Sequence, residues 1–154
     1  MKYINSYDCV LGKLYIAEED NKITNIFIEK PQHFKEFLLE ETVLIKTAKK
    51  QLTEYFEGSR KVFTLPLGPE GTLFQKKVWD ALLTIPYGKT CSYSDIAALI
   101  DNPKACRAIG GANGKNPIPI IIPCHRVIGK NGTLVGYTGG LHIKKQLLFI
   151  EGLI

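Results

Sequence analysis

The stretch Asn116–Val127 reads Asn-Pro-Ile-Pro-Ile-Ile-Ile-Pro-Cys-His-Arg-Val, and the rest of the chain is organised around it. Each of its prolines fixes its own φ and biases the preceding residue toward extended geometry, which excludes a helix here. The consecutive isoleucines are too apolar to remain in water. The pattern therefore predicts a stiff, extended and buried segment that presents Cys124, His125 and Arg126 at one defined place.

Cys124 is the candidate nucleophile of this segment. A free thiol has a pKa of about 8.5 and reacts as the thiolate, so a nearby base or positive charge must activate it at neutral pH. Side chains adjacent in an extended segment diverge, and we expect His125 to reach the sulfur through a water molecule. Its other ring nitrogen would need an orienting acceptor, for which Glu151 is the best candidate. Most buried cysteines are inert packing residues, so the pair alone leaves that alternative open.

The other cysteines and histidines do not indicate a metal site or a protease. The four cysteines lie far apart and form no CxxC pair, and the three histidines are scattered. Zinc ligands come at closer spacings, so no zinc site is predicted. The residues around Cys124 also lack the local signature of cysteine proteases. In a reducing compartment the thiols are expected to be free.

Composition bounds the class of protein. The chain has 154 residues and a formal net charge of +5. Its share of hydrophobic residues, 45%, is typical of soluble globular proteins. No apolar run approaches the roughly 18 residues of a membrane span, and Met1–Asn5 carries no apolar signal segment. We therefore expect a cytoplasmic monomer without membrane association. The modest positive charge is compatible with a polyanionic partner.

The first half of the chain is predicted to be a small sheet with a helix. Residues 13–17 and 23–28 are strand-like, and the polar residues between them predict a hairpin turn. A helix follows, with apolar residues at core-facing spacing over 45–56 and Gly58 as its stop. Residues 60–65 are expected to add a strand.

The stretch Leu67–Gly71 is rich in glycine and proline and reads as a linker. We therefore expect two domains, residues 1–66 and residues 67–154. Near the end of the chain, Asn131-Gly132 predicts a hairpin, and Leu141–Ile150 predicts a final helix.

The second domain is predicted to be mainly helical. Capping boxes at Thr72–Gln75 and Ser92–Asp95 each predict the start of a helix. A further helix is expected to be capped by Asn102, to carry Pro103 in its first turn and to run to about Ala112. Two short helices joined by a few residues indicate a helix-turn-helix.

Arg107 is the one long side chain on the second helix of that pair. Its neighbours there are small: Ala105, Cys106, Ala108, Gly110, Gly111 and Ala112. Small residues let a backbone approach another surface closely. That surface could lie inside the protein or on a partner, and the pattern alone leaves both interpretations open.

With these motifs in place, the sequence resembles the O6-alkylguanine-DNA alkyltransferases, also called methylated-DNA–protein-cysteine methyltransferases. The resemblance runs from Gly71 to Gly152 and centres on Pro123–Val127. Further matching motifs are Thr72-Leu73-Phe74-Gln75, Val78-Trp79, Ser92-Tyr93, the Arg107 helix, Asn116-Pro117, Gly139-Gly140-Leu141 and Glu151-Gly152. It implies an α/β (α+β) fold. A small N-terminal ribonuclease-H-like sheet domain would precede a mainly helical C-terminal domain with a helix-turn-helix.

The resemblance also implies irreversible repair of O6-alkylguanine in DNA, with O4-alkylthymine as a second candidate substrate. Cys124 would accept the alkyl group in a single displacement. His125, through a water molecule, and Glu151 would form the relay that produces the thiolate, and Asn116 would hold the active-site loops by hydrogen bonds. Because a thioether is stable and no residue could regenerate the thiol, one molecule would repair one lesion without a cofactor.

A base inside a duplex hides its O6 atom, so the nucleotide must be rotated out of the stack. By the same resemblance, Tyr93 would donate to the guanine edge. The backbone of Val127 and Thr138 would read the flipped base, and Tyr137 would wall the pocket. Arg107 would fill the gap that the base leaves.

The partner implied is double-stranded DNA that contains alkylated guanine. The helix of small residues would approach its minor groove, with Lys104 and Ala105 beside Arg107 at the interface. The competing class is a helix-turn-helix protein that recognises damage or regulates genes without reacting. Some relatives carry a structural zinc in the N-terminal domain, but this one offers only Cys9 and His33 there, and no metal is predicted.

Overall fold

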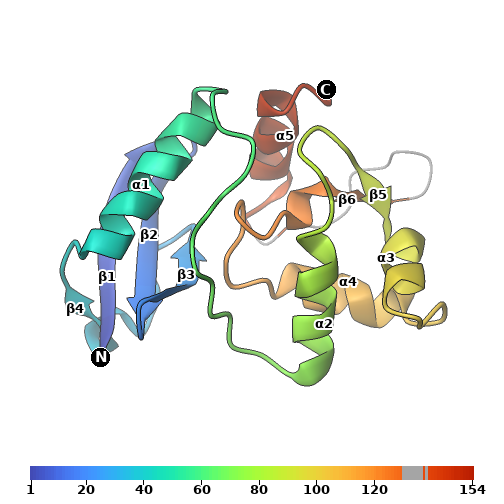
Figure 1. The fold of residues 1–154 in the computed structure, drawn as a ribbon, viewed down its shortest axis with the longest axis horizontal. Coiled ribbons are helices and arrows are strands. Elements are labelled where there is room, and N and C mark those ends of the chain that lie inside the picture. The colour runs from blue at the N-terminus through green and yellow to red at the C-terminus, as the bar shows by residue number, and fades with distance from the viewer. Residues whose placement is uncertain (130–136, 138) are drawn as a thin grey trace. The chain divides into compact units, whose positions relative to one another are not determined.

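The computed structural model describes residues 1–129, 137 and 139–154 (Figure 1). They form two compact units, Met1–Glu70 and Gly71–Ile154. The first unit carries a sheet and the second is mainly helical, which confirms the predicted fold class. Among the described residues, no helix is both long and apolar enough to cross a membrane.

A four-stranded sheet forms the first unit, in the order β3-β2-β1-β4. Its elements are β1 (Lys2–Cys9), β2 (Gly12–Glu19), β3 (Lys22–Phe27), the 3-10 helix η1 (Phe34–Glu36) and β4 (Leu38–Leu39). Strands β1 to β3 pair antiparallel, whereas β4 runs parallel to β1. The turn between β2 and β3 has positive φ at both Asp20 and Asn21, as a hairpin turn of the primed type requires. The predicted hairpin is thereby confirmed.

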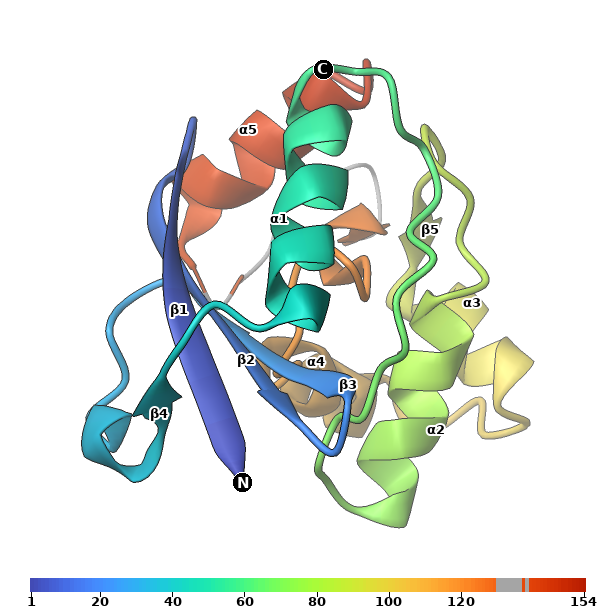
Figure 2. The same cartoon turned by 60° about the vertical axis from the view of Figure 1, so that its left-hand side comes forward.

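Helix α1 (Val43–Phe56) lies across one face of this sheet (Figures 1 and 2). The Thr42 side chain caps it by accepting a hydrogen bond from Ile45 N at 3.1 Å. Gly58 follows its end with a φ of +84°, a left-handed geometry that favours glycine. The side chains on the face that packs against the sheet are buried: Ile45, Ala48, Leu52 and Tyr55. The predicted helix and its glycine stop are confirmed.

The prediction of a strand over residues 60–65 is wrong. There the backbone N–H of Thr64 donates to the side chain of Gln51 (3.0 Å) instead of to a neighbouring strand. Pairing with β3 comes later, where Ile23 N donates to Pro66 O at 2.8 Å. Gly68 N donates to Ile23 O at 2.8 Å, which ties the start of the expected linker to the sheet. The first unit thus extends to Glu70, beyond the boundary expected after residue 66.

The described part of the second unit combines helices with one short parallel strand pair. Its elements are α2 (Leu73–Leu82), β5 (Cys91–Ser92), α3 (Tyr93–Leu99), α4 (Cys106–Gly114), the 3-10 helix η2 (Cys124–Arg126), β6 (Val127–Ile128) and α5 (Leu141–Ile150). Both predicted capping boxes, at Thr72–Gln75 and Ser92–Asp95, are confirmed. The predicted hairpin at Asn131-Gly132 lies outside the described residues.

The start of α4 differs from the prediction. The expected cap, Asn102, instead accepts a hydrogen bond from Ala105 N (3.0 Å) through its backbone oxygen. This closes a separate turn with Pro103 in its second position, a placement that β-turns favour. The helix itself begins at Cys106, without a side-chain cap, and runs to Gly114.

Helices α2, α3 and α4 lie side by side (Figure 2). The buried Trp79 of α2 donates from its indole nitrogen to Ala112 O of α4 at 2.9 Å. Helices α3 and α4 form the predicted helix-turn-helix pair. The tryptophan therefore anchors the second helix of that pair to the core and leaves its opposite side exposed.

Candidate active site

The segment that leads to Cys124 forms a tight turn, and the prediction of an extended run is wrong. Ile122 N donates to Ile118 O at 2.9 Å, and Ile120 takes a left-handed φ of +77°. Ile120 precedes no proline, so it escapes the restriction that prolines impose on their predecessors. Such a φ costs a β-branched residue conformational energy, and the surrounding contacts must maintain it. The predicted burial is confirmed, because residues 118–127 are all buried.

The Asn116 side chain clamps this turn. Its amide nitrogen donates to Ile122 O at 2.8 Å, and its amide oxygen accepts from Ile118 N at 2.9 Å. Asn116 is itself buried. A buried amide with both ends engaged holds the backbone rigidly, because breaking either bond would leave a buried polar group without a partner.

His125 and Glu151 meet directly. His125 Nε2 lies 2.6 Å from Glu151 Oε2, and both side chains are fully buried. The other carboxylate oxygen of Glu151 accepts from Gly88 N at 3.1 Å. With the Nε2 hydrogen directed at the carboxylate, Nδ1 carries the basic lone pair of the ring. This nitrogen is buried and makes no hydrogen bond to any described residue.

Arg126 binds the same carboxylate. Its Nε and Nη2 atoms lie 2.8 Å and 3.2 Å from the two oxygens of Glu151, and Nη1 donates to Ile85 O at 2.6 Å. Paired charge-assisted bonds of this kind are among the strong ones. Burial lowers the pKa of His125, the charge of Arg126 acts in the same direction, and Glu151 opposes both. The imidazole is therefore favoured in its neutral, basic form.

Cys124 is buried, with only 1% of its surface exposed. Burial raises the pKa of its thiol, because the charged thiolate loses its hydration. Hydrogen bonds from Asn116 and Tyr137 and the charge of Lys144 act in the opposite direction. Lys144 of α5 is fully buried and donates to Val127 O at 2.7 Å. Burial thus disfavours the thiolate, whereas Asn116, Tyr137 and Lys144 favour it.

Tyr93, the first residue of α3, belongs to the same surroundings. Burial raises its hydroxyl pKa, the charge of Cys124 adds to this, and Asn113 opposes it. Asn113 is buried in α4 and donates to Cys124 O at 3.4 Å. Val127 follows η2 directly and begins β6. The predicted residue Thr138 lies outside the described residues.

The predicted DNA-contacting residues lie at the exposed start of α4. Arg107 and Lys104 are exposed, and Ala105 is half-buried. Further along the helix, a Cβ added at Gly111 or Gly114 would meet no heavy atom within 4 Å. Interior packing therefore does not require small residues at these two positions, which favours the interpretation that they serve contact with a partner.

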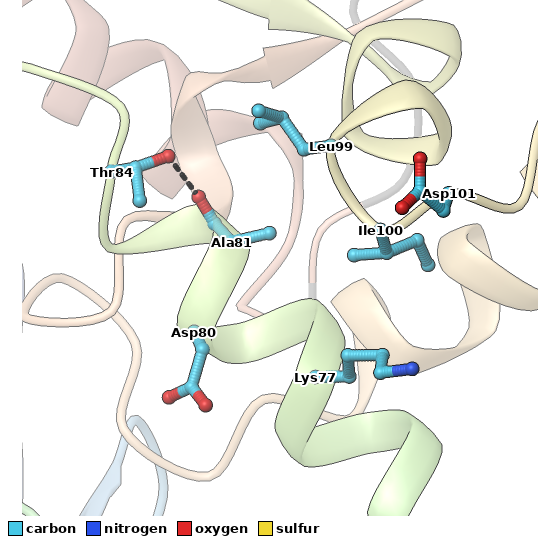
Figure 3. A pocket seen from close by; sticks show the side chains of 7 residues that line it. All are labelled: Lys77, Asp80, Ala81, Thr84, Leu99, Ile100 and Asp101. Atoms are coloured by element: carbon cyan, nitrogen blue, oxygen red, sulfur yellow. Dashed lines mark hydrogen bonds between the residues drawn. The ribbon is translucent and has the colours of Figure 1, made fainter.

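A separate hollow of about 440 Å³ lies between α2 and the end of α3 (Figure 3). The residues that line it are Lys77, Asp80, Ala81, Thr84, Leu99, Ile100 and Asp101. It contains none of the residues predicted to react or to bind DNA. The described residues also contain no group of three His, Cys, Asp or Glu side chains that could hold a metal ion.

Three residues of the site had no role in the sequence analysis: Arg126, Lys144 and Asn113. Arg126 was part of the central motif, but its partner could not be read from spacing. Lys144 and Asn113 did leave a signal, because each stands among the apolar, core-facing positions of its helix. A polar residue at such a position must find a buried partner.

Both units match known protein families. Residues 2–69 match the family described as 6-O-methylguanine DNA methyltransferase, ribonuclease-like domain, and residues 73–153 match its DNA binding domain. The constitutive methylated-DNA–protein-cysteine methyltransferase of Bacillus subtilis (strain 168) is 50% identical over 158 residues, which cover 98% of this chain and 96% of that protein. The methylated-DNA–protein-cysteine methyltransferase of Methanosarcina acetivorans is 47% identical over 157 residues, with coverages of 97% and 98%.

Solved structures of O6-methylguanine methyltransferases are also similar to this chain. The O6-methylguanine methyltransferase of Mycobacterium tuberculosis superposes with a TM-score of 0.91 at 42% identity, over 98% of this chain and 93% of that one. The structure of Mycobacterium tuberculosis OGT in complex with DNA gives a TM-score of 0.91 at 43% identity, over 97% and 92% of the two chains.

Proposed function

The chain belongs to the family of methylated-DNA–protein-cysteine methyltransferases, and on that premise we propose that it repairs DNA by transferring the alkyl group of O6-alkylguanine to its own Cys124. The observation that carries this proposal is that the buried Cys124 is followed directly in the chain by His125, whose ring nitrogen lies 2.6 Å from a carboxylate oxygen of Glu151. A neutral, oriented imidazole beside a thiol is the standard means of activating a nucleophilic cysteine.

The proposed reaction is a single displacement. His125 removes the thiol proton through a bridging water molecule, with Nδ1 as the acceptor and Glu151 fixing the ring through Nε2. The sulfur then forms a bond to the alkyl carbon as the bond from that carbon to O6 breaks, and the electron pair remains on guanine. Tyr93 donates a proton to the guanine edge, so the base leaves neutral, and the proton taken up by His125 then returns to Tyr93 through water. The proton lost by Cys124 balances the one that guanine gains.

The hydroxyl of Tyr93 suits this role. Burial and the neighbouring Cys124 raise its pKa above the ordinary value, so its proton is present at neutral pH. The backbone of Val127 and of Thr138 would read the flipped base, and Tyr137 would form one wall of its pocket. Asn116 maintains the turn that presents the sulfur to this pocket.

The exposed side of α4 supplies the proposed contact with duplex DNA. Gly111 and Gly114 leave open space at its surface, which allows the backbone to approach a minor groove closely. Arg107 would occupy the gap left by the flipped nucleotide, with Lys104 and Ala105 against the adjoining backbone. The protein would act as a monomer, once per lesion, and O4-alkylthymine is a second candidate substrate.

Intact-mass measurement tests the proposal. The wild-type protein, mixed with duplex DNA that contains O6-methylguanine, should gain the mass of one methyl group, and peptide mapping should place that group on Cys124. Cys124→Ser should bind the same duplex and gain nothing, because a hydroxyl is a far poorer nucleophile at neutral pH. Binding without a mass change in the wild type would instead favour a protein that only recognises lesions. A methyl group on Cys91 or Cys106 would refute the assigned nucleophile.

A further inference from the structure

Helix α5 carries a lysine on its buried face. Lys144 has no exposed surface and is one of the largest side chains that the protein buries completely. Burial lowers the pKa of this amine, because the ammonium loses its hydration. An interior charge of this kind is tolerated when neighbouring groups stabilise it.

The lysine is anchored to the backbone directly after the segment that contains the reactive cysteine. Lys144 Nζ donates to Val127 O at 2.7 Å, and Val127 immediately follows the 3-10 helix that contains Cys124. The two groups influence each other in opposite senses. The charge of Lys144 lowers the pKa of the Cys124 thiol, and the charge of Cys124 raises the pKa of Lys144.

The other charged groups around the sulfur are engaged with one another. Arg126 and His125 both bind the carboxylate of Glu151, so the positive charge of Arg126 is balanced within that cluster. Tyr137 acts on the thiol through a hydrogen bond, and the charge of Cys124 raises the pKa of Tyr93. Among the described residues, Lys144 is the cation whose charge lowers the pKa of the Cys124 thiol.

We propose that Lys144 and Cys124 form a buried ammonium–thiolate pair, in which Lys144 stabilises the negative sulfur during alkyl transfer. Lys144 is a positioning residue, because it acts on the sulfur and touches neither the alkyl group nor the base. His125 remains the proton acceptor, whereas Lys144 supports the charge left behind. This inference rests on the proposed role of Cys124 as the nucleophile.

The pair should titrate as a unit. From thiol and ammonium, loss of one proton gives the thiolate–ammonium pair, and loss of a second gives thiolate and amine. Because the groups interact, the measured pKa values belong to the pair. Removing the charge of Lys144 should therefore move the first step to higher pH. A lysine that served only to fill space would leave that step where it is.

The ultraviolet absorbance of the thiolate measures this directly and requires neither DNA nor access to the sulfur. The pH titration of each protein is corrected by subtracting that of its Cys124→Ser counterpart, which removes the tyrosine contribution. Lys144→Met, which keeps the length of the side chain, should show a Cys124 pKa about one unit higher, equivalent to about tenfold less thiolate at a given pH below that pKa. Lys144→Arg should restore most of the difference. A folded Lys144→Met protein with an unchanged titration would overturn the proposal.

A reciprocal measurement keeps the proposal testable even when changes at Lys144 prevent folding. The side-chain resonances of Lys144 are followed by NMR against pH in the wild type and in Cys124→Ser. Loss of the thiolate should lower the pKa of Lys144, since two coupled sites must affect each other equally. An identical lysine titration in the two proteins would refute the pair.

The two proposals can fail separately. Absence of methyl transfer in the wild type, together with the expected shifts in both titrations, would refute the repair function and leave the ion pair standing. Methyl transfer together with unshifted titrations would refute the ion pair alone.

Discussion

The carboxylate cluster around Glu151 and the exposed face of α4 serve the same proposed reaction but are built in opposite ways. Glu151 accepts hydrogen bonds from His125, Arg126 and Gly88, and it is almost completely buried. On α4, by contrast, Gly111 has open space beside it. In the cluster both carboxylate oxygens of Glu151 are bonded, whereas on α4 the backbone beside Gly111 is left uncovered.

This difference separates two kinds of functional residue. In the buried cluster, a substitution disturbs stability and chemistry together, because the same hydrogen bonds hold the fold and orient the imidazole. On the open face, a substitution can change contact with a partner while the fold remains intact or even gains stability. Measuring stability and activity side by side therefore shows to which kind a residue belongs.

Glu151→Gln should have the largest effect. It removes the charge that compensates the buried Arg126, and breaking a buried ion pair by removing one partner costs about 3–5 kcal/mol of unfolding free energy. The neutral amide also orients His125 less strongly, so methyl transfer should slow. Urea titration and single-turnover kinetics measure the two losses.

The control for this variant is an ion pair of similar length in the first unit. Arg60 Nε lies 2.8 Å from Glu54 Oε1, but the side chains of Arg60 and Glu54 are 27% and 32% exposed. Glu54→Gln should therefore cost no more than about 1 kcal/mol, the usual range for exposed pairs. Equal losses at Glu54 and Glu151 would mean that burial does not distinguish the two pairs.

Arg107→Ala should have the second-largest effect, and the effect should be confined to repair of duplex DNA. Rotating a base out of the duplex costs a few kcal/mol, and Arg107 is proposed to stabilise the extruded state. Repair of duplex substrate should fall by at least tenfold, while reaction with the free alkylated base and the unfolding free energy should stay near wild type. Single-turnover rates on both substrates check this. Equal losses on the two would assign Arg107 a structural role.

The sequence predicted those features of the fold that depend on neighbours in the chain. The hairpin before β3 and the capping boxes at Thr72 and Ser92 each follow from residues that contact one another locally. The strand prediction failed because a distant group supplied the hydrogen bond, and the prediction of an extended segment failed because the chain closed a local turn. Thr64 bonds to Gln51 of α1 instead of joining a strand, and Ile122 closes a turn that its flanking prolines do not forbid.

The candidate site shows the same limit. The sequence singled out Cys124, His125 and Glu151, because residue type and family resemblance identify them. It gave no role to Lys144, whose contact with Val127 depends on how α5 packs against β6. Only the three-dimensional arrangement joins that lysine to the sulfur.

Methylation of Cys124 should destabilise the protein. Adding a methyl group to a packed interior typically costs about 1–3 kcal/mol, and conversion to a thioether removes the negative charge that Lys144 is proposed to stabilise. Thermal melts before and after repair of a methylated duplex should show a lower Tm for the product. In Lys144→Met the drop should be smaller, since no charge pair is lost. An unchanged Tm on methylation of the wild type would show that the pocket accommodates the group without strain.

Gly111→Ala should have the smallest effect on the fold and should act in opposite senses on stability and DNA binding. Alanine in a helix interior is favoured over glycine by about 0.5–1 kcal/mol, and the added Cβ meets no heavy atom within 4 Å. Urea titration should therefore show a gain in unfolding free energy. The same methyl group protrudes from the face proposed to enter the minor groove, so affinity for duplex DNA should fall.

Gly58→Ala is the contrasting control. The φ of Gly58, +84°, strains any residue with a Cβ, so this substitution should lower the unfolding free energy. Affinity that stays at the wild-type value in Gly111→Ala and in the bulkier Gly111→Leu would show that this face of α4 does not contact DNA.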